Sequence, residues 1–388
     1  GSYRFFCNRD LLRTITGSDL APQTLAEFRD LWAQVAAYSR KRDRPVMPFA
    51  GSRENAWALM NIYMGGVTNG LSRELDHVGF MYIYPRQLLW SYLRGEWSFQ
   101  RPEIRAGLDL MGEFNAQMKL GYQQQPRDEA VREFLRGEAL FIFAVTLEAT
   151  SLRRMAAFQV DALRPPQPTK DDPVVGRYLL GRFADGNNLT YFGLYLNKRG
   201  PNKAVAVDFL RFLTSYEGNK LFSDGSGWPP SVCDVPIDPE IAPYLSPDDG
   251  YTYITNYLGC GGNTRALFQR NLHLLAGPQG SVDKFAAAFD AQMPAAVRAD
   301  LRAESRAAWL AVLPQDARIA ALSRLIPTVA SDPAQLLRRE RLEAAQNLSE
   351  ARALLITRQL QLAGDGPPPD QGRVEARSST NPTATGRR

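Results

Sequence analysis

Aromatic side chains that stand beside polar groups are the residues of this chain whose types and spacing could bind a small molecule. Sugars present apolar C–H faces together with many hydroxyls, so their binding sites combine aromatic rings with Asn, Asp, Glu and Arg side chains. Three stretches have this composition: Arg53-Glu-Asn-Ala-Trp57, the alternating pair Tyr82 and Tyr84, and the loop Gly227-Trp-Pro-Pro230. Each also has a structural interpretation, because Trp57 has helical spacing with Met60 and the tyrosines alternate like one strand face.

No recognised catalytic motif occurs in the sequence. It has neither a G-x-S-x-G nucleophile elbow nor a phosphate-binding P-loop, and Gly259-Cys-Gly-Gly-Asn263 lacks the third glycine of a dinucleotide loop. His77 and His273 lie far apart, and no two cysteines have C-x-x-C spacing. We therefore expect no cofactor, no metal site and no enzymatic activity. The enzyme alternative is a carbohydrate-active site that pairs Asp185 with Glu148.

The composition and charge of the chain limit the functions it can have. It has 388 residues, 44% of them apolar and 22% charged, which is enough for two domains with substantial cores. No run of 18 apolar residues is present, so we expect no membrane span. The net charge is only +5 and the one dense basic cluster is Arg338-Arg-Glu-Arg341, so we expect no nucleic-acid partner. If the protein is exported, Cys233 and Cys260 are the expected disulfide pair, with Cys7 free.

Helices that alternate with buried strands are expected to position these side chains. Thr24 and Glu27 form a capping box at the start of one helix, and Pro102 begins another that Gly121 closes. The unbroken apolar run Leu140–Val145 is typical of a strand covered on both faces. Further strands are expected at residues 45–49 and 158–163, and further helices at residues 128–136 and from Trp57 to a stop at Gly65 and Gly66. This alternation predicts an α/β fold with at least partly parallel sheets.

Three sequence blocks follow one another between Phe134 and Pro230. The first is Phe134-Leu-Arg-Gly-Glu-Ala139 before the apolar strand, the second is Asp185-Gly-Asn-Asn188 before the strand-like Tyr191–Leu196, and the third is Asn197-Lys-Arg-Gly-Pro-Asn202 before a helix at Ala204–Leu213. Upstream of them stand Tyr3–Leu11, Pro22–Phe28 and Ser98–Glu103. In this order and spacing, over residues 3–290, the blocks resemble the bacterial extracellular solute-binding proteins of carbohydrate-type ABC transporters.

The resemblance implies a two-lobed α/β fold of the periplasmic-binding-protein type II, with an incomplete first lobe and a C-terminal helical extension. In that family a further stretch of the first lobe precedes the segment that resembles Tyr3–Leu11, whereas here only Gly1-Ser2 precede it, with the character of an expression scar. We expect residues 3–185 to form the partial first lobe and the crossover into the second, residues 186–290 the remainder of the lobes and the hinge region, residues 291–364 the helical extension, and residues 365–388 a disordered tail.

The resemblance also implies an exported, non-enzymatic protein, periplasmic or extracellular, with or without a membrane tether. It would close on a small-molecule ligand, expected to be a sugar, and deliver it to an ABC transporter permease. After the strand Leu140–Val145 the family often has Gly-x-Trp, and this chain has Thr146-Leu-Glu148 there. Glu148 is therefore expected to accept sugar hydroxyls or to pair with a cationic ligand. The expected ligand contacts are Trp57, Tyr63, Tyr82 and Trp228 for stacking, and Arg53, Glu148, Asn187 and Asn188 for hydrogen bonding.

The residues after 290 leave a second interpretation open. Helices are expected at residues 282–292 and 295–313, and a third from Ser331 to Gly364 whose apolar seam is Arg341, Leu348, Leu355 and Leu362 with Ala344 and Ala351. Such a helix is expected to dock a protein partner through residues 331–363. In the alternative, the chain is a degenerate binding-protein-like sensor or interaction domain of a larger membrane-associated protein.

Overall fold

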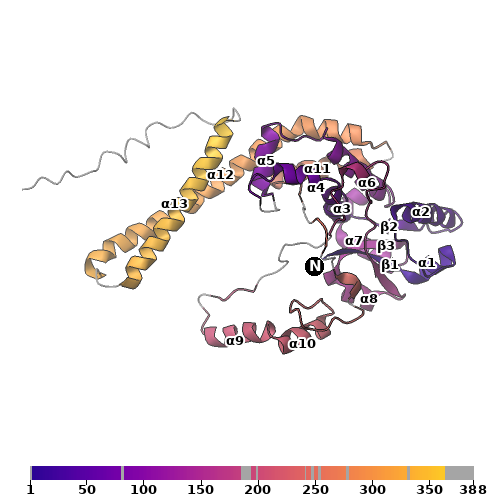
Figure 1. The fold of residues 1–388 in the computed structure, drawn as a ribbon, viewed down its shortest axis with the longest axis horizontal. Helices are drawn as coiled ribbons and strands as arrows, with labels where there is room; N and C mark the ends of the chain where they lie inside the picture. The colour runs from indigo at the N-terminus through magenta and orange to yellow at the C-terminus, as the bar shows by residue number, and fades with distance from the viewer. Residues whose placement is uncertain are drawn as a thin grey trace, which may run out of the picture. The chain divides into compact units, whose positions relative to one another are not determined.

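The computed structural model describes residues 2–79, 83–184, 194–197, 200–240, 242–245, 249–251, 255–276, 279–329 and 333–362 (Figure 1). The chain divides into two compact units. The first unit comprises Gly1–Pro85, Trp97–Gly259 and Ala266–Ala291, and the second comprises Arg86–Glu96, Cys260–Arg265 and Gln292–Arg388. The expected disordered tail, residues 365–388, lies outside the described residues.

A four-stranded mixed sheet organises the described part of the first unit. Its order is β2 (Met47–Ala50), β3 (Ala139–Val145), β1 (Tyr3–Asn8) and β4 (Val160–Leu163). β1 pairs antiparallel with both β3 and β4, while β2 pairs parallel with β3. The predicted α/β class with a partly parallel sheet is therefore confirmed. β3 is an unbroken apolar run, and β1 is buried from Arg4 to Asn8, because both faces of the sheet are covered.

Successive side chains of β1 enter two different cores, as the strand period of two requires. Phe5 lies in an aromatic cluster with Phe28 of α2 (Leu25–Ser39) and Phe114 of α6 (Pro102–Asn115). Phe6 lies on the other face, in a core that includes Phe134 of α7 (Arg127–Leu135) and Leu152 of α8 (Ala149–Met155). The sheet is thus held between two helical layers (Figure 1).

Local sequence signals account for several helix boundaries. Thr24 and Glu27 form the predicted capping box, Pro102 stands at the start of α6, and Gly137 adopts φ 70° just after α7. Asn8 caps α1 (Arg9–Thr16) by accepting the N–H of Leu11 at 3.0 Å. These ends are sharp because polar side chains or left-handed glycines satisfy the terminal backbone groups.

The predicted stop of the third helix at Gly65 and Gly66 is wrong. α3 (Arg53–Val67) continues through both glycines, and α4 (Asn69–Leu75) follows after one residue. α3 packs along α6, and its Ile62, Met64 and Val67 are almost fully excluded from solvent. This packing overrides the low helix propensity of glycine, which amounts to about 1 kcal/mol per residue.

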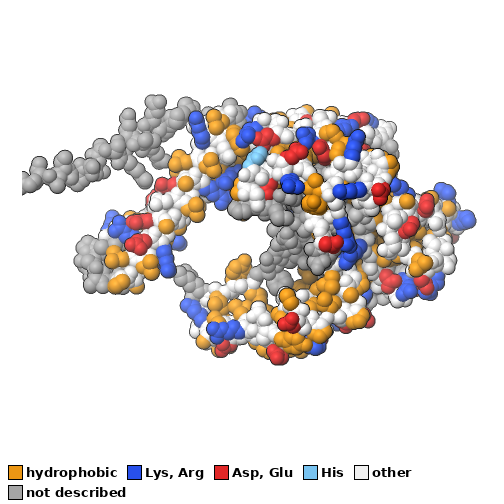
Figure 2. Space-filling model, viewed as in Figure 1, with side chains coloured by type: hydrophobic (Ala, Val, Ile, Leu, Met, Phe, Trp, Pro, Cys, Tyr) orange, Lys and Arg blue, Asp and Glu red, His pale blue; other side chains and the backbone are white. Residues whose placement is uncertain are grey.

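The α9–α10 segment carries an exposed apolar surface. α9 (Lys203–Leu213) is the predicted helix, and α10 (Tyr216–Ser226) follows it. No residue of α9 is buried, although Val205, Phe209 and Phe212 share one face. Figure 2 shows hydrophobic side chains gathered over this segment. The strand expected at residues 191–196 is wrong for residues 194–196, which are described and not in a strand, while residues 191–193 lie outside the described part.

The C-terminal region is a long antiparallel helical hairpin, which confirms that this part of the chain is helical. α12 (Val282–Val329) is 48 residues long and α13 (Pro333–Leu362) is 30. The break expected between residues 292 and 295 is wrong, because α12 continues through Pro294. Met293, Val297 and Leu301 are fully buried along one face, and this burial offsets the roughly 3 kcal/mol cost of an internal proline.

The seam by which α13 packs on α12 differs from the predicted one. Ala353, Ile356 and Leu360 are buried, whereas the predicted seam residues Leu348, Leu355 and Leu362 are 73%, 48% and 62% exposed. Bonds between the helices confirm the register: Arg352 to Glu304 at 2.6 Å, Ser305 to Thr357 at 3.2 Å and Gln315 to Ser349 at 3.5 Å. α13 therefore packs on α12 through a face other than the one that carries Leu348, Leu355 and Leu362.

Two further expectations concern the cysteines and the membrane. None of the three cysteines forms a disulfide, Cys7 and Cys260 being buried and Cys233 exposed, so the expected Cys233–Cys260 disulfide is wrong. Among the helices that the structure describes, none combines the length and the apolar character needed to cross a bilayer.

Candidate functional site

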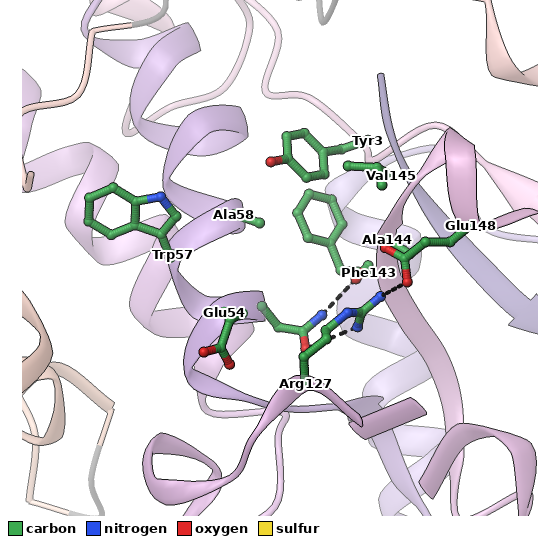
Figure 3. Close-up of a pocket in the computed structure, with 10 residues that line it drawn as sticks. Tyr3, Glu54, Trp57, Ala58, Arg127, Phe143, Ala144, Val145 and Glu148 are labelled. Atoms are coloured by element: carbon green, nitrogen blue, oxygen red, sulfur yellow. Dashed lines mark hydrogen bonds and ion pairs between the residues drawn. The ribbon is translucent and has the colours of Figure 1, made fainter. Parts of the chain in front are cut away.

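A pocket of about 260 Å³ lies within the first unit, where strands β1 and β3 meet helices α3 and α7. β1 and β3 supply aromatic and aliphatic walls, α3 supplies its first two turns, α7 its first residue and the 3₁₀ helix η2 (Thr146–Glu148) a carboxylate. The lining residues are Tyr3, Glu54, Asn55, Trp57, Ala58, Arg127, Phe143, Ala144, Val145 and Glu148 (Figure 3).

The first turn of α3 is fixed by a hydrogen-bonded Asn55. Ser52 is the N-cap and accepts the N–H of Asn55 at 3.1 Å, while its hydroxyl donates to Asn55 Oδ1 at 2.7 Å. The Asn55 amide donates to the carbonyl of Phe143 at 2.6 Å, which ties α3 to β3. Since Asn55 is only 2% exposed, these bonds position the helix start against the sheet.

Arg127 and Glu148 form the charged wall of the pocket. The guanidinium donates to Glu148 Oε2 at 2.7 Å and to Asn55 Oδ1 at 3.3 Å (Figure 3). Arg127 is the first residue of α7, where the helix dipole disfavours a cation, so the carboxylate compensates for its position. The two side chains keep 22% and 36% of their area exposed, which leaves polar atoms within reach of a solute.

Aromatic rings form the apolar walls. Tyr3 stacks on Phe143 with ring centroids 5.0 Å apart and 15° between the planes. Trp57 packs edge-on against Phe268 at 5.4 Å. A Cβ atom on Gly259 would overlap the indole of Trp57, so the absence of a side chain there sets the position of this ring. In the view of Figure 3 the indole and the Tyr3–Phe143 pair lie on opposite sides of α3.

The charges of the described residues that line the pocket sum to minus one. Among these residues, Glu54 and Glu148 are acidic and Arg127 is the only cation. Arg53 stands beside Glu54 at 3.7 Å, with both side chains nearly half exposed, and does not line the pocket. This balance suits a neutral or amine-bearing solute better than a phosphate or a sugar acid, which would add negative charge beside two carboxylates.

The structure brings two of the eight predicted contacts into this pocket, Trp57 and Glu148. Trp228 lies after α10, edge-on to Phe222 at 5.6 Å, and Arg53 lies at the surface. Tyr82, Asn187 and Asn188 lie outside the described residues, as does Asp185 of the enzyme alternative. Their roles as ligand contacts stay predictions.

The prediction that Tyr63 contacts the ligand is wrong. Its side chain is fully buried and stacks on Phe114 with centroids 4.3 Å apart. Burial raises the pKa of its hydroxyl well above the ordinary value, because the charged form would lose its hydration. The residue belongs to the interface between α3 and α6, where a solute cannot reach it.

Sequence reasoning missed Tyr3, Asn55, Arg127 and Phe143. Tyr3 and Phe143 meet only because β1 pairs with β3, and no local pattern reveals a pairing across that distance in sequence. Arg127 has a local signal, a cation at the start of a helix that begins after Pro126, which implies a nearby carboxylate. Asn55 also has a local signal, because it is the third residue after Ser52, at the position whose N–H a capping serine accepts.

A second pocket in the first unit, of about 550 Å³, lies along the segment Pro165–Pro168. Arg164, Lys170 and Arg182 line it, but Arg164 already donates to the carbonyl of Leu245 and Arg182 pairs with Asp249. None of the predicted contacts that the structure describes lines it. The smaller pocket is the better candidate, because aromatic and hydrogen-bonding groups converge there. Within the described residues, no cluster of His, Cys, Asp and Glu could hold a metal ion.

Comparisons with known proteins give structural likeness only. No protein-family model matches the sequence, and no curated protein is similar to it in sequence. Among solved structures, a chitin oligosaccharide binding protein is 17% identical, with 76% of this chain and 70% of that chain covered and a TM-score of 0.49. RafE in complex with raffinose is 16% identical, with 76% and 71% covered and a TM-score of 0.49. A Streptococcus pneumoniae solute-binding protein in complex with the blood group A-trisaccharide is 15% identical, with 76% and 69% covered and a TM-score of 0.47.

Proposed function

We propose that this protein binds a small carbohydrate, neutral or amine-bearing, in the pocket that Tyr3, Trp57 and Glu148 help to line. The observation that supports this is that one pocket is lined both by aromatic rings and by a carboxylate and a guanidinium that keep exposed polar atoms. The rings match the apolar face of a sugar, and the Arg127–Glu148 pair offers a donor and an acceptor to adjacent hydroxyls. The small volume favours a ligand of one or two rings.

The biological role that fits this site is solute capture for an ABC-type uptake system, outside the cytoplasm. In that role the protein would present its sugar to a permease and perform no reaction on it. Glu148 is held by Arg127, and its carboxylate can accept hydrogen bonds from sugar hydroxyls. The permease and the periplasmic or extracellular location are parts of the proposal.

A thermal-shift screen of the full chain against neutral sugars, amino sugars, sugar acids and polyols tests the proposal. A ligand present at a hundred times its Kd adds about 2.7 kcal/mol to the free energy of unfolding. We expect neutral or amino sugars to raise the Tm and sugar acids to leave it unchanged. Trp57→Ala and Glu148→Gln should each remove the shift.

Trp309→Ala is the matched control, because Trp309 is 40% exposed and does not line the pocket. It should keep the full ligand-induced shift. A folded wild-type sample that no sugar stabilises, or a shift that survives both pocket variants, contradicts the proposal.

A further inference from the structure

α13 carries a regular apolar repeat on the face that it does not use against α12. Leu337, Leu348, Leu355 and Leu362 are 47%, 73%, 48% and 62% exposed. With the exposed residues between them they form a stripe spaced alternately by three and four residues, which we call the outer stripe: Leu337, Arg341, Ala344, Leu348, Ala351, Leu355, Arg358 and Leu362. This spacing is the a/d pattern of a helix that packs along a second helix.

The inner seam of the hairpin is a separate set of residues. Leu342, Gln346, Ser349, Ala353, Ile356 and Leu360 have the same three-and-four spacing and are buried or half-buried against α12. The inner seam is therefore complete without the outer stripe. Four leucines at heptad-related positions that remain exposed have no role in the hairpin itself, which indicates a surface for another helix.

Arginine dominates the charge around the outer stripe. The exposed charged residues of α13 are Arg338, Glu340, Arg341, Arg352 and Arg358. Arg352 reaches back to Glu304 of α12, whereas Arg341 and Arg358 stand within the stripe itself. A helix that packs on the stripe must therefore place carboxylates opposite these two arginines, since an apolar or basic partner would bury their charge without compensation.

We propose that the outer stripe of α13 docks an amphipathic helix of a different protein, whose apolar heptads are flanked by Asp and Glu. A second copy of this chain is a poorer occupant. A parallel pair would set Arg341 and Arg358 each against its own copy, and an antiparallel pair would set Arg341 against Arg358. A lipid surface is also poorer, because Arg341 and Arg358 interrupt the apolar face that would be buried among the acyl chains. This surface is independent of the sugar pocket, which lies in the other unit.

Two synthetic helices test the proposal with the full chain. Both have about four heptads with leucine at the a and d positions, one with glutamate and the other with lysine at the flanking positions. We expect the glutamate helix to bind at least about tenfold more tightly than the lysine helix, and to lose affinity as salt rises. Leu348→Glu combined with Leu355→Glu should weaken its binding at least about tenfold.

Leu310→Glu on α12, which is 55% exposed and outside the stripe, is the matched control and should bind as the wild type does. Arg341→Glu combined with Arg358→Glu should reverse the preference in favour of the lysine helix. Equal binding of the two helices, or no binding of either, overturns the proposal. If sedimentation gives the mass of a dimer for the wild type and of a monomer for the double leucine variant, the stripe binds a second copy and the proposal is overturned. Binding to phosphatidylglycerol vesicles that the double leucine variant loses would also overturn the proposal.

Discussion

Asn55 is the residue on which the geometry of the pocket depends most directly. One buried amide connects the cap of α3, the backbone of β3 and the guanidinium of Arg127. Its oxygen accepts two bonds and its nitrogen donates one, so few of its hydrogen-bonding positions are left unused. Loss of this side chain would leave the Phe143 carbonyl without the bond that Asn55 supplies and release Arg127 from one of its two anchors.

We expect Asn55→Ala to lower the free energy of unfolding by about 1–3 kcal/mol, the range for leaving buried partners unsatisfied. Urea unfolding measured by circular dichroism gives the value. Asn202→Ala is the matched control, because Asn202 is exposed and its side chain makes no capping bond to α9. A loss no larger than that of the control would contradict the connecting role of Asn55.

The cysteines differ in reactivity for a physical reason. Burial raises the pKa of the Cys7 and Cys260 thiols, with Asp161 and Asp300 adding to the effect, so both stay protonated and shielded. Cys233 is exposed. We expect an alkylating reagent near pH 8 to modify one thiol of the native chain and three of the denatured chain, as counted by intact mass. Modification of Cys7 or Cys260 in the folded state, or a denatured mass two hydrogens short, would disprove this assignment.

At the scale of elements, α9 shows a helix whose apolar face contributes little to the stability of this fold. Phe209 is 58% exposed, while Phe134 of α7 is fully buried. We expect Phe209→Ala to change the free energy of unfolding by less than about 0.5 kcal/mol, and Phe134→Ala to lower it by about 3–5 kcal/mol. Chemical denaturation of both variants checks this difference. A comparable loss in the two would mean that α9 is packed in solution.

Helix starts and buried strands could be predicted from the sequence because their causes are local. The Thr24–Glu27 capping box and the apolar run of β3 each lie within a few residues. The continuation of α3 through Gly65 and Gly66, and of α12 through Pro294, could not be predicted. Packing against distant residues decides whether glycine or proline ends a helix. The seam of α13 was missed for a similar reason: two stripes have heptad spacing, and only the partner α12 determines which is buried.

The same distinction applies to the site. Trp57 and Glu148 were predicted as binding residues from aromatic and polar composition and from family resemblance, and both line the pocket. The wall that Tyr3 and Phe143 form depends on strand pairing, and Tyr63 looked like a binding residue because helical spacing does not tell a cleft face from a core face. Composition therefore predicts which residue types could bind a ligand, and strand pairing determines which of them lie together in the pocket.

At the scale of the whole molecule, the two units are interleaved along the chain. The second unit draws on three separate segments, and the first includes Ala266–Ala291, where α12 begins. Phe285 and Phe289 of that stretch are fully buried and pack against each other, and both contact Phe99. Removal of the C-terminal hairpin by a cut before α12 would therefore also open the core of the first unit.

The central place of β1 in the sheet has a consequence for how the chain is made. β1 pairs on one side with β3 and on the other with β4, which ends at Leu163. A ribosome that adds about 5–20 residues per second needs roughly 8–30 s after β1 to reach that point. β3 is complete only at Val145, so until then the segment Phe5-Phe6-Cys7 has neither neighbour and is exposed to wrong pairing with other nascent chains. A chaperone that covers β1 during synthesis would therefore be expected to raise the yield of folded protein.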